Sequence, residues 1–178
     1  MAVYDERKFA ELVLYVAEQL ADDPAGGALK LNKVLFFSEF AHVRAHGRPI
    51  TGAEYQRLEH GPAPRRLVPV RDALIGAGDA TFQEVVYLGY KQNRLVATRP
   101  ADRFMFSPGE LDVVDQVVAE LAHYSGTQLS DLSHEDMGWR MVEDGETIPY
   151  EAAYLRPPVA TDRIRRRAAE LAAQLLSR

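Results

Sequence analysis

One segment of the chain, residues 28–46, is apolar over most of the surface of the helix that it would form. Gly47 follows at the position of a C-terminal glycine cap. A helix with such a wide apolar surface is normally surrounded by other elements. The segment therefore predicts a central helix, and its apolar residues are Leu31, Val34, Leu35, Phe36, Phe37, Phe40, Ala41 and Val43.

Other stretches show the three- and four-residue apolar spacing of amphipathic helices. Asp5 is a suitable N-cap for the first of them, and Ser107, Pro108 and Glu110 form a capping box before a later one. The predicted helices cover residues 5–22, residues 64–77, the run after Ser107, and a shorter stretch from Thr127 or Ser130 to Leu132.

Two stretches rich in β-branched and aromatic residues, 81–88 and 94–98, predict a β-hairpin. The polar run Lys91-Gln92-Asn93 between them is expected to form the turn, and residues 53–59 predict a short strand. The expected fold class is α+β: a mostly helical single domain with a small antiparallel sheet that includes the hairpin.

The rigid pair Pro157-Pro158 divides the chain into a domain at residues 1–155 and a C-terminal segment at 156–178. The segment carries a net charge of +4 and predicts a basic amphipathic helix that begins at Thr161. We expect this helix to pack on the domain, to join two copies as a homodimer, or to contact a partner. Its apolar stripe is Ile164, Ala168, Leu171 and Leu175, beside a basic turn of Arg163, Arg165, Arg166 and Arg167.

Composition excludes several classes of protein. There is no cysteine, so disulfides and thiol nucleophiles are excluded. No apolar run approaches the ~20 residues of a membrane span, and no secretory leader opens the sequence, so we expect a cytoplasmic protein without a membrane partner. The net charge of −5 is concentrated in residues 102–155, which carry −10. This pattern is not that of a uniformly basic nucleic-acid binder.

No catalytic or metal-binding constellation stands out. His42 and His46 share a helical face, but no further ligand accompanies them. The run His134-Glu135-Asp136 lacks the second histidine of a zinc-protease motif, because position 138 is Gly. There is also no nucleophile elbow and no phosphate-binding loop. We therefore expect a protein that is not an enzyme and that carries no metal or cofactor.

A winged-helix DNA-binding regulator is the alternative. The hairpin at 81–98 would be the wing, with Lys91 and Arg94 at its tip. The helix at 64–77 would enter the groove with its arginines. The overall acidity and the proline within this helix count against it, so a nucleic-acid partner is not expected.

An ordered set of motifs carries more information. The stretch Lys30-Leu31-Asn32-Lys33-Val34-Leu35 is followed by Gly47-Arg48-Pro49-Ile50 and then by His60-Gly61-Pro62-Ala63-Pro64. This order and spacing resemble the Panacea, or SocA-like antitoxin, domain, a phage-associated family. The resemblance covers roughly residues 7–155 and includes Trp139 and Ile148-Pro149. Val34 and Ala63 depart mildly from the usual residues.

The resemblance implies an antitoxin that neutralises a toxin, encoded by an adjacent gene, through direct protein contact. In one branch of the family the antitoxin is an adaptor that delivers the toxin to an AAA+ protease. We expect the contact surface near the 28–46 helix and the 60–64 turn. Lys30 and Lys33 share one helix edge, where they are either solvated, with nearby acids as ion-pair partners, or in contact with the toxin. The candidate toxin-binding residues are Lys30, Lys33, Phe37, Tyr55, His60 and Arg65.

Overall fold

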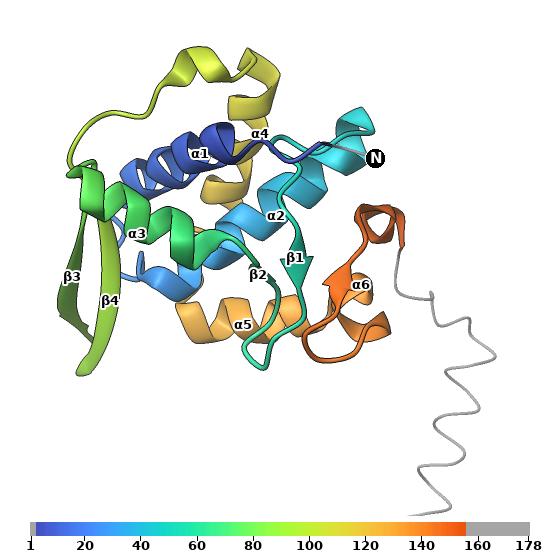
Figure 1. Cartoon of the computed structure of the whole chain (residues 1–178). Coiled ribbons are helices and arrows are strands. Elements are labelled where there is room, and N and C mark those ends of the chain that lie inside the picture. Colours follow the sequence, from blue (N-terminus) through green and yellow to red (C-terminus); the bar gives the residue numbers. More distant parts are fainter. Residues whose placement is uncertain (1–2, 156–178) are drawn as a thin grey trace, which may run out of the picture.

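The computed structural model describes residues 3–155 and places one helix, α2, at the centre of the molecule (Figure 1). Helices α1, α4 and α5 pack against α2, which confirms the predicted central helix and the mostly helical α+β class. The helices are α1 (Glu6–Gln19), α2 (Ala28–His46), α3 (Leu67–Ala77), α4 (Pro108–Leu121), α5 (Gly126–His134) and α6 (Met137–Met141), with short 3-10 helices η1 (Arg103–Met105) and η2 (Tyr150–Tyr154).

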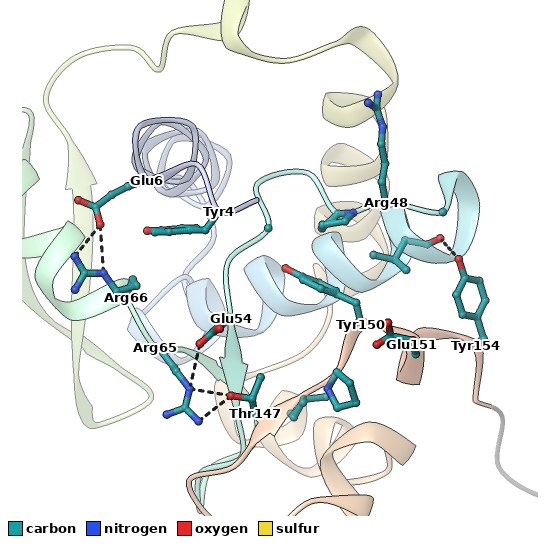
Figure 2. Close-up of a pocket in the computed structure, with 16 residues that line it drawn as sticks. Tyr4, Glu6, Arg48, Glu54, Arg65, Arg66, Thr147, Tyr150, Glu151 and Tyr154 are labelled. Atoms are coloured by element: carbon teal, nitrogen blue, oxygen red, sulfur yellow. Dashed lines mark hydrogen bonds and ion pairs between the residues drawn. The ribbon is translucent and has the colours of Figure 1, made fainter. Parts of the chain in front are cut away.

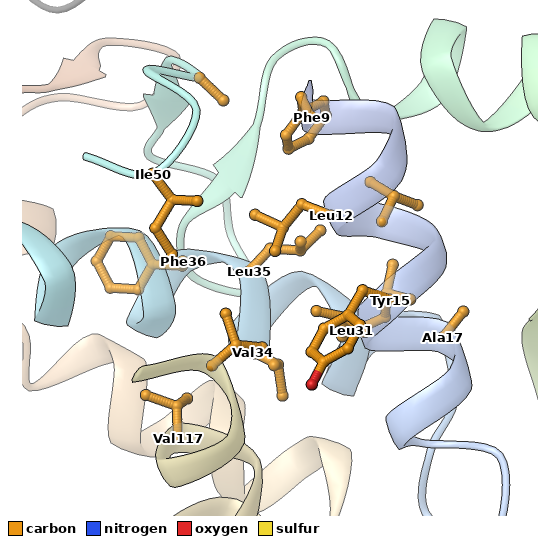
Figure 3. Close-up of a cluster of buried hydrophobic side chains, with 14 of the residues drawn as sticks. Phe9, Leu12, Tyr15, Ala17, Leu31, Val34, Leu35, Phe36, Ile50 and Val117 are labelled. Carbon is orange, nitrogen blue, oxygen red and sulfur yellow. The ribbon is translucent and has the colours of Figure 1, made fainter. Parts of the chain in front are cut away.

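The core lies between α1 and α2 (Figure 3). From α1, Phe9 and Leu12 are fully buried, as are Val34, Leu35 and Phe36 of α2. Burial of each such side chain contributes about 1.5–3 kcal/mol relative to an exposed position. These residues occupy the helical spacing noted in the sequence, so periodicity alone places the first two helices.

The helix ends follow the predicted signals. The Asp5 carboxylate accepts a hydrogen bond from the Lys8 backbone N–H at 2.9 Å, and Gly47 adopts the left-handed conformation with φ 74°. The capping box at Ser107 is present. Helix α3 begins at Leu67, later than predicted. Pro69 is then in its first turn, where a missing N–H costs no intrahelical hydrogen bond.

The strands form two separate antiparallel sheets. In the first, β1 pairs with the other two strands, so that Tyr55 faces both Pro64 and Ile148. The second is the predicted hairpin, which stands apart beside α1 and α3 (Figure 1). The strands are β1 (Tyr55–Gln56), β2 (Ala63–Pro64), β3 (Ala80–Tyr87), β4 (Tyr90–Ala97) and β5 (Thr147–Ile148).

The hairpin turn is not where the sequence placed it. Leu88 and Gly89 form the two-residue turn, with φ of 50° and 82°, and the polar run Lys91-Gln92-Asn93 lies within β4. Two-residue hairpin loops favour positive φ at both positions because their twist then matches that of the strands. Gly89 is therefore the better signal for the turn. The polar run Lys91-Gln92-Asn93 was a poor one, because most of this hairpin is exposed and polar residues are tolerated within its strands.

Two smaller expectations also need correction. Ser125, with Gln128, is the N-cap of α5, so Gly126 begins this helix, and neither Thr127 nor Ser130 does. The strand expected over 53–59 is limited to Tyr55–Gln56. The C-terminal helix expected from Thr161 lies outside the described residues. Among the helices of residues 3–155, none has the length and apolar character that crossing a bilayer requires.

Candidate functional site

The two lysines of α2 lie in the interior of the protein. Lys30 is fully buried, and its Nζ lies 2.5 Å from a carboxylate oxygen of Asp23. The same ammonium donates hydrogen bonds to the carbonyls of Ala122, at 3.2 Å, and Tyr124, at 2.9 Å. Lys30 thus ties the end of α4 and the loop after α1 to the central helix.

Lys33 is buried beneath the 60–64 turn. Its Nζ donates a hydrogen bond to the Pro62 carbonyl at 3.1 Å, and burial lowers the pKa of its ammonium to about 8. Gly61, with φ 93°, lies directly above it. A Cβ there would be 2.5 Å from Lys33 Nζ and would collide with the Ser133 hydroxyl. The turn therefore requires glycine at this position.

The expectation that Lys30 and Lys33 are solvated is wrong. The loop after β1 and the connection between α4 and α5 cover the helix edge that carries them. Lys30 pairs with the nearby acid Asp23 and donates to carbonyls of that connection, and Lys33 donates one hydrogen bond to the loop. Tyr55 is buried as well, with its ring packed edge-on against Phe36 and Phe40. In this conformation these three residues are inaccessible, and they hold the surface elements in place.

A buried carboxylate fixes the chain just after α2. Glu39 accepts hydrogen bonds from the backbone N–H of Ile50 at 2.6 Å and of Thr51 at 3.1 Å, and from the Thr51 hydroxyl. Burial raises the pKa of this carboxyl to about 7. The turn that carries Arg48 is thereby held against the helix. An acidic residue within an apolar helix was the sequence signal for this role, and it was overlooked.

The loop at 57–62 is fastened to α5 and α6. Trp139 donates its indole N–H to the Leu58 carbonyl at 3.1 Å. Its ring stacks on His134, with centroids 4.3 Å apart, and the Arg57 guanidinium lies 4.1 Å from its centre. The loop thus presents the exposed His60 side chain from a well-anchored backbone.

The β1–β2 pair that carries this loop also contributes to the wall of a groove of about 1020 Å³ (Figure 2). Its walls come from the start of the chain, the turn after α2, the β1–β2 pair and the segment from β5 to η2. Charged and aromatic side chains line it together. The basic residues are Arg48, Arg65 and Arg66, and the tyrosines are Tyr4, Tyr150 and Tyr154.

The arginines of the groove differ in their partners. Arg66 pairs with Glu6 at 2.8 Å. Arg65 donates to the Gly145 carbonyl at 2.5 Å and to the Thr147 hydroxyl at 3.0 Å, and so bridges to β5. Arg48 is exposed and has no carboxylate within ion-pair distance in residues 3–155. It is thus the arginine of this groove that is most open to a partner.

The structure brings only some of the predicted contact residues together. Arg65 lines the groove and His60 lies on the adjacent loop, whereas Phe37 is half-buried in a different groove between α2, α4 and α5. Sequence reasoning missed Tyr4 and Arg48 as groove residues. They come from distant segments, and only the fold brings them to one surface.

The cations required by the winged-helix alternative are occupied within the chain. Arg71 pairs with Asp72 at 2.8 Å, and Lys91 with Glu84 at 2.7 Å. Arg94 is not at the hairpin tip and donates instead to the carbonyls of Ala21 and Asp23. The arrangement thus gives this alternative no free basic surface on α3 or the hairpin.

The two α2 histidines do not form a metal site here. Their rings lie 4.5 Å apart, and His42 Nδ1 is 2.6 Å from the Arg48 carbonyl oxygen. Within residues 3–155, no cluster of three or more histidines and carboxylates has the geometry to hold a metal ion. The lining of the groove offers recognition through hydrogen bonds, charge and aromatic contact.

Comparison with known proteins adds one finding. The family model described as antitoxin SocA-like, Panacea domain matches residues 31–140, more than half of the chain. The match covers α2 from Leu31 onward, helices α3, α4 and α5, most of α6, and both sheets except for β5, whereas α1 lies before it. Neither a curated protein nor a solved structure matches the chain.

Proposed function

The chain belongs to the SocA-like, Panacea antitoxin family, and from this premise we propose that it neutralises a cognate toxin by direct binding. The contact surface in this proposal is the groove of Arg48 and Arg65 together with the 57–62 loop. The toxin is encoded by an adjacent gene, and binding takes place in the cytoplasm. The role is non-enzymatic and needs no cofactor.

The observation that supports this surface best is the composition of the groove. Tyrosine and arginine are the residues that most often dominate the energy of protein interfaces, because they combine apolar area with directional hydrogen bonds. Here three residues of each kind line one groove, beside acidic groups such as Glu151. The buried Lys33 and Glu39 fix its surrounding loops in advance, which lowers the entropy cost of binding.

A growth assay tests the antitoxin role. The open reading frame adjacent to the gene is induced alone and then together with this protein. We expect growth arrest in the first case and its relief in the second. A neighbour that is toxic and stays toxic during co-expression would contradict the role. The half-life of the toxin in the rescued cells separates masking, in which it persists, from delivery to an AAA+ protease, in which it is lost.

Copurification tests the surface. Arg48→Glu should weaken toxin binding by about 1–3 kcal/mol, a range typical of interface arginines. Arg7→Glu is the matched control, because Arg7 is also exposed and lies on α1 outside this groove. Equal binding by both variants would place the interface elsewhere.

A gel-shift titration at two salt concentrations tests the DNA-binding alternative. An affinity for DNA that falls steeply as salt is raised would support it, since phosphate contacts weaken steeply with salt.

A further inference from the structure

A second groove lies between α2, α4 and α5. It has a volume of about 270 Å³ and a mainly apolar lining, with Phe37 and Ala41 from α2, Leu121 from α4 and Leu132 from α5. A cavity of ~150 Å³ is enough for benzene, so this groove has room for at least one aliphatic side chain. It is separate from the groove proposed to bind the toxin.

The walls of this second groove are acidic. Glu120 and Asp136 line it. Residues 104–139, which form α4, α5 and the start of α6, contain seven aspartates and glutamates and no lysine or arginine. Of the seven acids, Glu110 is used in an ion pair with Lys8, Asp115 accepts from the Tyr15 hydroxyl, and Asp136 accepts from the Trp139 backbone N–H. The lining contains one cation, Arg44, so the two wall acids and the acidic helices around them leave a net negative charge beside the apolar lining.

The described chain ends beside this groove. Arg44 lines the groove, and its side chain donates to the Ala153 carbonyl at 2.9 Å. The described part of the chain thus ends at Leu155, two residues after a direct contact with the groove wall. Residues 156–160, if extended, span about 15–18 Å, which is enough to bring the following residues to the groove.

The sequence of this segment complements the groove in both respects. Ile164, Ala168, Leu171 and Leu175 recur at helical spacing, and the segment carries six arginines against two acids. An amphipathic basic helix laid in an apolar groove with acidic walls is a common mode of recognition. We propose that residues 156–178 dock in this groove within the same chain, with the apolar stripe inward and the arginines toward Glu120 and Asp136.

The absence of cysteine from the chain makes a clean cross-linking test possible in the full-length protein. Ala41→Cys provides a thiol in the groove. A second cysteine is placed in turn at 164, 168, 171 and 175 on the stripe, and at 166, 170 and 173 on the opposite face. Disulfides need Cα atoms within about 4.4–6.8 Å, so the yield reports proximity. Val86→Cys, on the hairpin, replaces Ala41→Cys as the control, because Val86 is exposed and outside the groove.

We expect oxidation to cross-link the stripe position that lies nearest Ala41→Cys within single chains at least roughly tenfold faster than any opposite-face position or the hairpin control, because docking raises the effective concentration. Uniform or undetectable cross-linking would overturn the proposal. Cross-links found only between two chains would overturn it as well, because the occupant would then be a second copy.

A charge variant tests the acidic wall. Glu120 is exposed, so Glu120→Lys should leave the fold intact while slowing cross-linking of the stripe roughly two- to fivefold, the range of one exposed ion pair. Asp112→Lys on the same helix makes the same change of charge at an exposed position outside the groove and should have a smaller effect. An equal rate in all three proteins would contradict the proposal. No toxin is present in these experiments, so their outcome is independent of the proposed antitoxin role.

Discussion

The central helix and the hairpin reverse the usual distribution of polarity. Helix α2 buries Lys30, Lys33 and Glu39 almost completely, whereas the hairpin tip leaves Val86 71% and Tyr90 79% exposed. The hairpin base follows the ordinary rule, because Ala80 and Leu95 are buried against the helices. The difference arises because the tip extends past the helices that support its base (Figure 1).

The comparison shows that burying a charged side chain and exposing an apolar one have different consequences for the fold. Each buried charge of α2 makes directional bonds to the backbone of a loop, so it fixes a position that apolar contact alone would leave free. The exposed apolar residues at the hairpin tip do not fix the position of another element in this way. Mutations on the buried side should therefore cost far more than mutations at the tip.

The largest effect is expected at Gly61, above Lys33. Gly61→Ala should lower the free energy of unfolding by about 3 kcal/mol or more, because the new Cβ meets Ser133 and Lys33 and the residue keeps a positive φ. Gly78→Ala is the control, since Gly78 has φ 80° with open space around it and should cost only about 1–2 kcal/mol. Urea denaturation measures both, and equal losses would show that the buried lysine does not restrict the turn.

The next largest loss of stability is expected on replacing the two buried lysines of α2. Lys30→Met should destabilise the protein by about 3–5 kcal/mol, because it leaves the Asp23 carboxylate without its partner. Lys33→Met leaves the Pro62 carbonyl unsatisfied but also removes the cost of burying the ammonium, so it should cost at most about 1 kcal/mol. The measurement is denaturant unfolding of both variants at pH 7. A larger loss for Lys33→Met would contradict this assignment of roles.

The pH dependence of stability isolates Lys33. Its pKa is about 8 in the folded protein and 10.5 as the ordinary value, so the unfolded state binds more protons between these limits. Stability should therefore rise with pH from about 8 to 10.5, by up to about 3 kcal/mol. Lys33→Met should remove this rise while leaving the contributions of other groups in place. Superimposable pH profiles for the two proteins would argue against a buried, charged lysine.

The smallest effect is expected at the hairpin tip, and it should be favourable. Leu88 occupies a turn position with φ 50°, which leucine adopts at a cost and asparagine tolerates. Leu88→Asn should raise the midpoint of thermal unfolding and add about 0.5–1 kcal/mol of stability. Val86→Thr, which is exposed in the adjacent strand, should change stability by less than about 0.5 kcal/mol. A destabilising Leu88→Asn would mean that the exposed leucine has a role in the fold.

The sequence predicted the parts of the fold that depend on local signals. The apolar spacing of α1 and α2 and the caps at Asp5, Gly47 and Ser107 lie within a few residues of the elements they define. The burial of Lys30 could not be predicted in this way. It depends on the carbonyls at 122 and 124, about ninety positions away in the chain.

The candidate site was predicted less completely for the same reason. Arg65 and His60 lie near the turn whose glycine and prolines mark it in the sequence. Tyr4, Arg48 and Tyr150 reach the groove only because α1, the turn after α2 and the segment after β5 meet there. No spacing rule links residues that far apart, so their grouping required the folded structure.

The stack of Arg57, Trp139 and His134 also gives the protein an optical signal of its own. Trp139 is the only tryptophan, so all indole fluorescence comes from the point where the 57–62 loop is fastened to α5 and α6. Release of the loop would expose the indole to water and shift its emission to longer wavelength. The attachment of this loop can thus be followed in real time, in the unlabelled protein, as a partner arrives.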